Sequence, residues 1–468
     1  MTDFLVITYS LYSMYVTTVL EQQRGREPQL SSYGFHVFVV YFTLLQAFYF
    51  VRSATHYTKR SRTMNRRFTT IQFKVTYQVF ICILKIFGLF PFGYNCVERR
   101  YFESKVLYAY SGILLGIYIY FVGSFKWNIV KNMSMESSQY NIFLMASALV
   151  LVYVGVVVTS LVALFFSSNF LVLFNDLRRL WYKMKVLSTI PSILDRKLLT
   201  RFFVKIFIID GGYFLGIAYA NSRQLFGHAD VNEQTVLYDT LYNLHNFAAN
   251  ATFINLFVAI SYLGAHYYRL INVRIRNVHQ KLEKVSNDNT AKKRLVFSRI
   301  ARELHQLAQW HGQVNQLTLS FMNLYGASLS AMVLKFFMIL LGSLFGAYVT
   351  TVVQLSMGLP VQGGLVAFHL LMVSFYFVQY YYLVASAAIF TKRAEKSGTI
   401  LDSLARIDES GGHLEDLIAT FSLELLHRNN KIENNGMFIV DYSLIYAALA
   451  SMLGYLIIAV QFQITDVT

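Results

Sequence analysis

The basic residues of this chain are concentrated in every second gap between its long apolar runs. Seven runs are long enough to cross a bilayer as helices, since about 20 apolar residues span ~30 Å of hydrocarbon. The runs are 105–124, 141–167, 203–222, 249–270, 328–350, 364–391 and 438–463. Of the 41 Lys and Arg residues, 31 fall in the segment 53–104 or in the gaps after the second, fourth and sixth runs, and only 3 fall in the other gaps.

This alternation predicts both the class of protein and its orientation. Short loops that are rich in Lys and Arg stay in the cytoplasm because they resist translocation. The chain is therefore predicted to be an all-α membrane protein with seven transmembrane helices. Its N-terminal side is expected in the cytoplasm and its C-terminus outside the cell.

The composition agrees with a membrane protein. Hydrophobic residues make up 55% of the chain and charged residues 14%, whereas soluble domains carry about 25% charged residues. The net charge of +16 is explained by the cytoplasmic loops and by the anionic lipid that such loops face. We therefore expect membrane lipid, and not nucleic acid, as the partner of these charges. Cys82 and Cys96 share one predicted cytoplasmic segment, so no structural disulfide is expected.

The sequence contains no motif of an enzyme, a metal site or a cofactor site. The patterns CxxC, HExxH and GxSxG and the phosphate-binding glycine loop are all missing. His305 and His311 lie six residues apart on a polar helix, which is not a metal-ligand spacing, and both are expected to be solvated. We expect no catalytic activity, no metal and no cofactor.

Residues 1–69 are predicted to be an N-terminal extension with an apolar stretch of its own, 34–51. A signal peptide is not expected, because no basic segment precedes a short apolar core with a small-residue cleavage site. The basic residues between Arg52 and Arg67 would hold the end of 34–51 in the cytoplasm. The stretch then either adds a span, with the N-terminus outside, or lies in the membrane interface as an aromatic-rich helix.

The gaps that face outward are short, with about 13 to 26 residues, and have no room for a folded domain. The first of them contains the sequon Asn132-Met-Ser134, which predicts glycosylation of Asn132. A chain of the opposite orientation, that of a G-protein-coupled receptor, would place this sequon in the cytosol.

The inward gaps carry amphipathic helical patterns. Residues 70–104 are predicted to be a cytoplasmic segment before the first span, and 271–327 and 393–436 to be helical hairpins that extend the inner ends of the spans. Because their apolar faces must be buried, we expect the hairpins to form a cytoplasmic anchor domain. It would lie beneath the seven-helix domain 105–463, and 464–468 would be an extracellular tail.

The last run carries two short motifs. Gly-x-Phe-x-x-Asp opens it, and a Tyr, five apolar residues and Gln-Phe close it, the residues being Gly436, Phe438, Asp441, Tyr455, Gln461 and Phe462. The pattern resembles the last helix of the insect gustatory receptor family, whose signature places Thr-Tyr before the five apolar residues. Gly454 stands in the place of that Thr. The segment 86–92, Ile-Phe-Gly-Leu-Phe-Pro-Phe, is also similar to the family, and the resemblance covers about 70–468.

The resemblance implies a gustatory receptor that acts as a ligand-gated, non-selective cation channel in the plasma membrane of a sensory neuron. It implies a homo- or hetero-tetramer whose last helix lines the central pore, with a gate at Ile458, Gln461 and Phe462. The residues allow this, because spacings of three and four place side chains on one helix face. Taken alone, Gln461 either bonds water at the headgroup level or joins a water-facing ring built from several subunits.

The tastant site is less well defined. Aromatic and hydroxyl side chains are frequent in the outer halves of the third to sixth runs, where such stripes are typical of packing or of interfacial belts. The resemblance places the tastant pocket there, which makes candidates of Tyr219, Phe253, Phe345, Tyr348, His369 and Tyr376. The sequence leaves open whether the ligand is a sugar, a bitter compound or another tastant.

Two charges lie at equal depth inside the predicted spans, Asp210 in the third and Lys335 in the fifth. Charges in the membrane are costly and are usually paired or face a cavity. The two either form an ion pair or never meet, each of them snorkelling to the interface or facing a cavity.

A second class of function is a heptahelical receptor that signals through G proteins. The predicted orientation and the very short tail argue against it.

Overall fold

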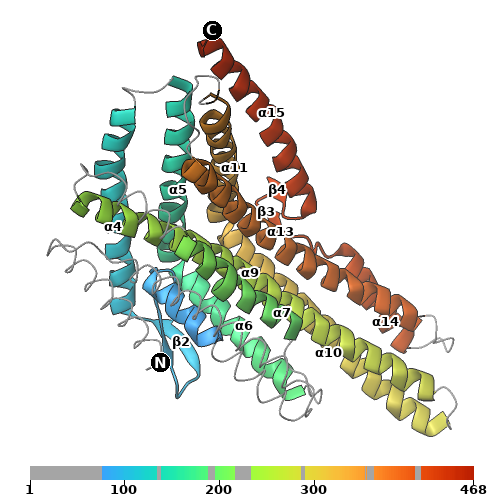
Figure 1. Ribbon diagram of the computed structural model, residues 1–468. Coiled ribbons are helices and arrows are strands. Elements are labelled where there is room, and N and C mark those ends of the chain that lie inside the picture. Colours follow the sequence, from blue (N-terminus) through green and yellow to red (C-terminus); the bar gives the residue numbers. More distant parts are fainter. Residues whose placement is uncertain are drawn as a thin grey trace, which may run out of the picture. The chain divides into compact units, whose positions relative to one another are not determined.

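The chain is mostly helical from residue 76 onward (Figure 1). The computed structural model describes residues 76–133, 139–187, 196–216, 233–285, 290–353, 355, 363–405 and 413–467. All of them belong to one unit, Gln72–Thr468. The apolar stretch 34–51 and Tyr219 lie outside the described residues.

The helices and strands follow the order of the apolar and amphipathic segments. A helix over Thr76–Ile86 comes first. The following helices are α4 (Lys105–Met133), α5 (Gln139–Phe165), α6 (Ser167–Leu187), α7 (Arg196–Phe203), the π-helix η2 (Val204–Asp210), α9 (Glu233–Val285), α10 (Thr290–Leu324), α11 (Gly326–Tyr348), the π-helix η3 (Val349–Val353), α13 (Gly363–Ala405), α14 (His413–His427) and α15 (Tyr442–Val467). Two short antiparallel hairpins pair β1 (Phe92–Asn95) with β2 (Arg100–Glu103), and β3 (Glu433–Asn434) with β4 (Phe438–Ile439).

Four helices in the described part are long and apolar enough to cross a membrane, namely segments of α9, α11, α13 and α15. The consecutive helices α5 and α6 meet at a bend of 75° and make a fifth span if they are counted as one. The described parts of the seven predicted runs are helical except at residue 166, in the bend between α5 and α6, and at 438–441, where the last run begins with β4 before α15. Lys105–Tyr120 is a shorter apolar stretch of α4, and the third run is described only as far as residue 216. Length and composition therefore support four or five spans.

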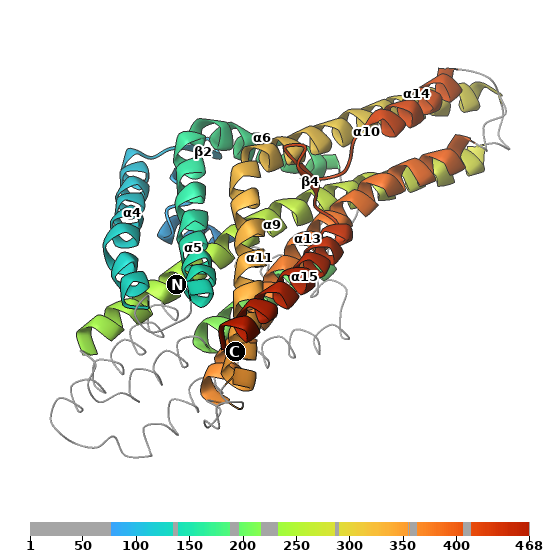
Figure 2. The same ribbon diagram turned by 90° about the horizontal axis from the view of Figure 1, so that it is seen from above.

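The long helix α9 is the centre of the packing. It has 53 residues and packs against α13, α10 and α5, while α11 packs against α5 and α13. Gly264 permits the close approach of α9 to α13, because a Cβ there would lie 2.7 Å from Cε2 of Phe390. The C-terminal part of α9 runs beside α13, and α10 lies along α14 (Figure 2). The amphipathic segments thus bury their apolar faces on one another.

The β1–β2 hairpin is fixed to α6 by an amide that bonds its backbone. Oδ1 of Asn175 accepts a hydrogen bond from the backbone N–H of Tyr101 at 2.8 Å, and Nδ2 of Asn175 donates one to the carbonyl of Tyr101 at 3.2 Å. In the register of the hairpin, Phe92 lies opposite Glu103 and Asn95 opposite Arg100. These two bonds hold the hairpin against α6.

Candidate functional site

A buried ion pair lies inside the third predicted span. Lys205 is completely buried, and its Nζ lies 3.1 Å and 2.9 Å from the two carboxylate oxygens of Asp210. Both residues belong to η2, where hydrogen bonds that skip five residues bring side chains at i and i+5 onto one face. On a regular α-helix the two would point about 140° apart. The local π-helical geometry therefore makes the pair.

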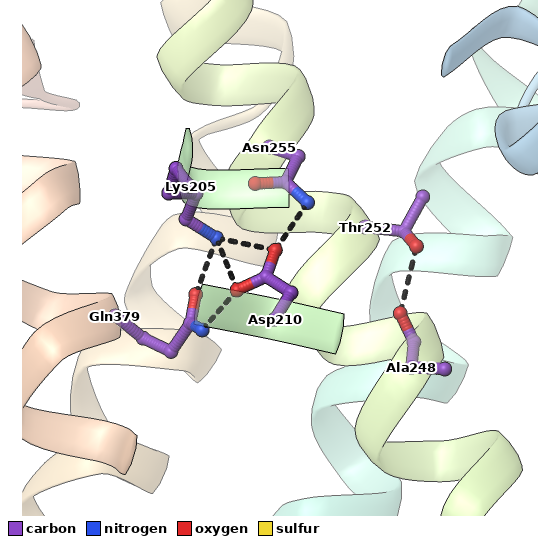
Figure 3. Close-up of polar contacts among 6 residues, drawn as sticks. All are labelled: Lys205, Asp210, Ala248, Thr252, Asn255 and Gln379. Carbon is purple, nitrogen blue, oxygen red and sulfur yellow. Dashed lines mark hydrogen bonds and ion pairs between the residues drawn. The ribbon is translucent and has the colours of Figure 1, made fainter. Parts of the chain in front are cut away.

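Two amides from other helices complete this polar network (Figure 3). Gln379 of α13 accepts a hydrogen bond from Lys205 at 2.6 Å and donates one to Asp210 at 2.7 Å. Asn255 of α9 donates to the other carboxylate oxygen of Asp210 at 2.7 Å. Both charges are thus satisfied by more than one partner, as an ion pair away from water requires. The network ties η2, α9 and α13 together.

The structure does not bring Asp210 and Lys335 together. Lys335 is completely buried in α11 and donates to Oδ1 of Asn250 at 2.6 Å. Its Nζ also lies 5.0 Å and 5.8 Å from the ring centres of Phe336 and Tyr376, a distance at which ring faces attract a cation. Of the two alternatives left open by the sequence, the structure therefore has the separate charges, since the lysine five positions earlier already neutralises Asp210.

Three of the candidate ligand residues lie near the C-terminal end of α11 or the N-terminal end of α13. The rings of Phe345 and Tyr348 are stacked with their centres 6.3 Å apart. The ring of His369 fills the space beside Gly346, where a Cβ would come within 2.6 Å of its Cε1. Tyr376 lies further along α13, beside the buried ammonium described above.

The remaining two candidates differ in their surroundings. Tyr376 is buried among aromatic rings, with Phe375 at 5.1 Å and Phe247 at 6.1 Å between ring centres. Its hydroxyl is buried and has no hydrogen-bond partner in the described part of the chain. Phe253 is buried in α9 and faces Tyr325, 6.4 Å away.

The helix α15 packs on the rest of the chain through a narrow stripe. Its buried residues are Ile445, Met452 and Ala459, seven positions apart, and the helix contacts α11 and α13. Most of its other side chains are exposed. Ile458 and Gln461 lie on this exposed surface, with Ile458 44% exposed. The side chain of Phe462, like that of Asn132, lies outside the described residues.

The motif residues at the start of α15 have local structural roles. Asn435 and Gly436 adopt positive φ values of 48° and 74°, which reverse the chain between β3 and β4. Asp441 accepts the backbone N–H of Ser443 at 2.9 Å and so caps the first turn of the helix. Tyr455 packs edge-on against a ring of α11, that of Phe337, with ring centres 5.8 Å apart. The motif thus fixes where α15 begins and how it sits on α11.

His311 is buried, which corrects the expectation that it is solvated, whereas His305 is exposed as expected. Nδ1 of His311 lies 3.1 Å from a guanidinium nitrogen of Arg428, which also pairs with Glu424 at 2.7 Å. Burial and the neighbouring guanidinium lower the pKa of His311 to about 3. Within the described ranges, no three His, Cys, Asp or Glu side chains lie close enough to hold a metal ion.

Comparison with known proteins decides the family. A family model described as 7tm chemosensory receptor matches residues 74–466. The chain belongs to this family of chemosensory receptors. No curated protein sequence matches the receptor.

Solved structures agree on the fold of the receptor. It is similar to the insect olfactory receptor OR5 from Machilis hrabei in complex with eugenol, with 13% identity, a TM-score of 0.58, and coverage of 84% of this chain and 99% of that one. A second structure of OR5 gives 11% identity, a TM-score of 0.55 and the same coverage. The resemblance to the insect chemoreceptors is confirmed, and the G-protein alternative finds no support.

Sequence reasoning missed three members of the receptor's buried polar network, namely Lys205, Asn255 and Gln379. Lys205 had a signal, because an opposite charge five residues from Asp210 in an apolar run fits π-helical spacing. The two amides had none, since each comes from a distant part of the chain.

Proposed function

We propose that this chemosensory receptor is a gustatory receptor and acts as a ligand-gated, non-selective cation channel that a tastant opens. The observation that carries the proposal is the surface of α15, an apolar helix that buries one stripe and exposes the rest. Lipid alone would explain the exposed apolar side chains. The amide of Gln461 on the exposed surface favours a water-lined axis shared by several copies, because polar groups in a membrane usually face water or one another.

In the proposed assembly, four copies, identical or from related receptors, place α15 around a central pore. Ile458, Gln461 and Phe462 form the constriction, where amides replace part of the hydration shell of a cation and apolar side chains close the path by dewetting. The receptor resides in the plasma membrane of a sensory neuron.

The proposed topology has seven spans. They are α4, α5, the segment that contains η2, α9, α11, α13 and α15, with the N-terminal side in the cytoplasm and the C-terminus outside. The extensions of α9 and α13, together with α10 and α14, then form a cytoplasmic anchor domain, and Asn132 is glycosylated outside. The mutual packing of these four helices supports this arrangement.

The tastant is proposed to bind near Tyr348, His369 and Tyr376, at the ends of α11 and α13 that this topology places outside. The buried hydroxyl of Tyr376 has no partner among the described residues, so a ligand can bond it without displacing another group. The similar olfactory receptor was solved with eugenol, which supports a small organic molecule as the ligand.

Two measurements on cells that express this chain alone test the proposal. Sugars and bitter compounds are applied during whole-cell recording with a G-protein inhibitor in the pipette, and we expect agonist-evoked cation current that the inhibitor does not reduce. A C-terminal epitope tag should be labelled on intact cells. Labelling that requires permeabilisation, or current that the inhibitor abolishes, would contradict the proposal.

A further inference from the structure

An apolar cavity lies at a distance from the proposed tastant site, between the helix Thr76–Ile86, the β1–β2 hairpin, α6, α7 and α9. Its volume is about 350 Å³, within the range of about 300–1,000 Å³ that is typical of small-molecule sites. Its walls include Phe80, Leu84, Phe90, Leu177, Leu198 and Phe202. None of the five described candidate tastant residues lines it. Such a wall suits a hydrocarbon chain.

A basic groove adjoins this cavity, between the turn of the β1–β2 hairpin and α6. Its basic residues are Arg99, Arg100, Arg178, Arg179 and Lys183, against two carboxylates. Tyr101, Arg178 and Tyr182 line both the cavity and the groove. The apolar space and the basic space therefore meet at Arg178.

Arg178 is held in place by aromatic rings. Its guanidinium carbon lies 4.2 Å, 5.6 Å and 5.5 Å from the ring centres of Tyr94, Tyr101 and Tyr182, and it donates to the hydroxyls of Tyr94 and Tyr182. Among the described residues, no carboxylate lies within ion-pair distance of Arg178 or of the exposed Lys183. A fixed guanidinium without a carboxylate has donors left for an anion.

A second polar group suited to a ligand lies in the wall of the cavity. The hydroxyl of Thr76 is buried in the wall and has no hydrogen-bond partner in the described part of the chain. A buried hydroxyl of this kind is costly unless a ligand or water bonds it.

We propose that the cavity and the groove form one site for an anionic phospholipid of the surrounding membrane. One acyl chain occupies the cavity, the phosphate binds Arg178 and Lys183, and the ester oxygen at the glycerol end of that chain accepts a hydrogen bond from Thr76. The apolar walls disfavour a soluble anion, and the basic groove disfavours a neutral lipid. Under the proposed topology the groove faces the inner leaflet, which carries the anionic lipids.

The first test measures lipid binding to the purified full-length receptor by native mass spectrometry, with phosphatidylserine and phosphatidylcholine as probes. We expect the receptor to retain phosphatidylserine in preference to phosphatidylcholine. Arg178→Gln and Lys183→Gln should each weaken phosphatidylserine binding about fivefold, the effect of one basic residue near an anionic headgroup. Lys183 is exposed and forms no cation–π pair among the described residues, so its variant tests the site even if Arg178→Gln fails to fold. Arg276→Gln removes an exposed charge of α9 outside the groove and should change nothing.

The second test separates a lipid from a free phosphate. Ala259 lines the cavity, so Ala259→Phe should fill it and abolish retention of phosphatidylserine, whereas Ala367→Phe at an exposed position of α13 should not. Added inorganic phosphate should not displace the lipid. Equal retention by wild type and the Lys183→Gln and Ala259→Phe variants would overturn the proposal. So would a site that holds phosphate alone, or one that retains no lipid because another part of the chain fills it.

Discussion

Substitution of Asp210 by Asn should strongly destabilise the receptor. Lys205 is completely buried and bonds both carboxylate oxygens, and Gln379 and Asn255 each donate to one of them. The variant keeps the shape of the side chain but leaves the ammonium without its counter-charge. Removal of one partner of a buried ion pair costs about 3–5 kcal/mol, so the ratio of folded to unfolded protein should fall by roughly two to four orders of magnitude.

The assay is thermal unfolding of the detergent-solubilised full-length receptor, followed by fluorescence-detected size exclusion, together with labelling at the cell surface. Asp176→Asn is the matched control, because Asp176 pairs with Arg179 at 3.2 Å on the surface, where the two side chains are 37% and 75% exposed. An exposed pair contributes about 0–1 kcal/mol. We therefore expect a melting temperature several degrees lower for Asp210→Asn and a nearly unchanged one for the control.

A double variant separates lost charge from lost shape. Lys205→Met with Asp210→Asn removes both charges and leaves only neutral amides to re-pair, at a cost of about 1–3 kcal/mol. It should melt at a higher temperature than the single variant Asp210→Asn. The reasoning is refuted if Asp210→Asn unfolds at the same temperature as Asp176→Asn, or if the double variant is the less stable of the two Asp210 variants.

Two further predictions concern packing and pH. His311 has a folded pKa of about 3, below its usual value of about 6.5. As the pH falls, His311 is therefore protonated in the unfolded state before it is protonated in the folded state. The free energy of unfolding should decrease below pH 6.5 by up to about 1.4 kcal/mol per pH unit. Melting temperatures at several pH values should show a weaker dependence in His311→Leu; an unchanged one would contradict the burial beside Arg428. Gly264→Ala places a Cβ 2.7 Å from Phe390 and should cost about 1–3 kcal/mol. By contrast, Gly398→Ala, with nothing within 4 Å, should be neutral or stabilising by up to about 1 kcal/mol, and equal melting of the two glycine variants would contradict the packing of α9 on α13.

The class of protein, its helices and its family were predictable from the sequence. Runs of about 20 apolar residues can satisfy their backbone in a membrane only as helices or in a closed barrel, and the runs are long enough for helices. The motif around Asp441 and Tyr455 pointed to the family, and both residues have structural roles: the aspartate caps α15 and the tyrosine packs on α11.

The polar interior was only partly predictable. Asp210 and Lys335 were recognised as costly charges, but their partners depend on a π-helical segment and on amides that lie up to 169 positions away in the chain. The burial of His311 depends on Arg428 and the α14 segment, and periodicity within one helix carries no information about it. The cavity beside Arg178 is built from five elements, so no single stretch of sequence indicates it.

Whole-cell current of α15 variants tests the central claim, that this helix lines a pore, most directly. Gln461→Glu would bring up to four carboxylates together in a tetramer and should strengthen block by divalent cations. Ile458→Ala should raise the current without agonist, because a wider constriction dewets less readily. Leu449→Ala is the control, since Leu449 is similarly exposed, at 37%, and lies nine positions earlier, about 180° around the helix axis. The account predicts stronger calcium block for Gln461→Glu, raised basal current for Ile458→Ala and wild-type behaviour for the control. Wild-type current, selectivity and block in all three variants at equal surface levels would contradict it.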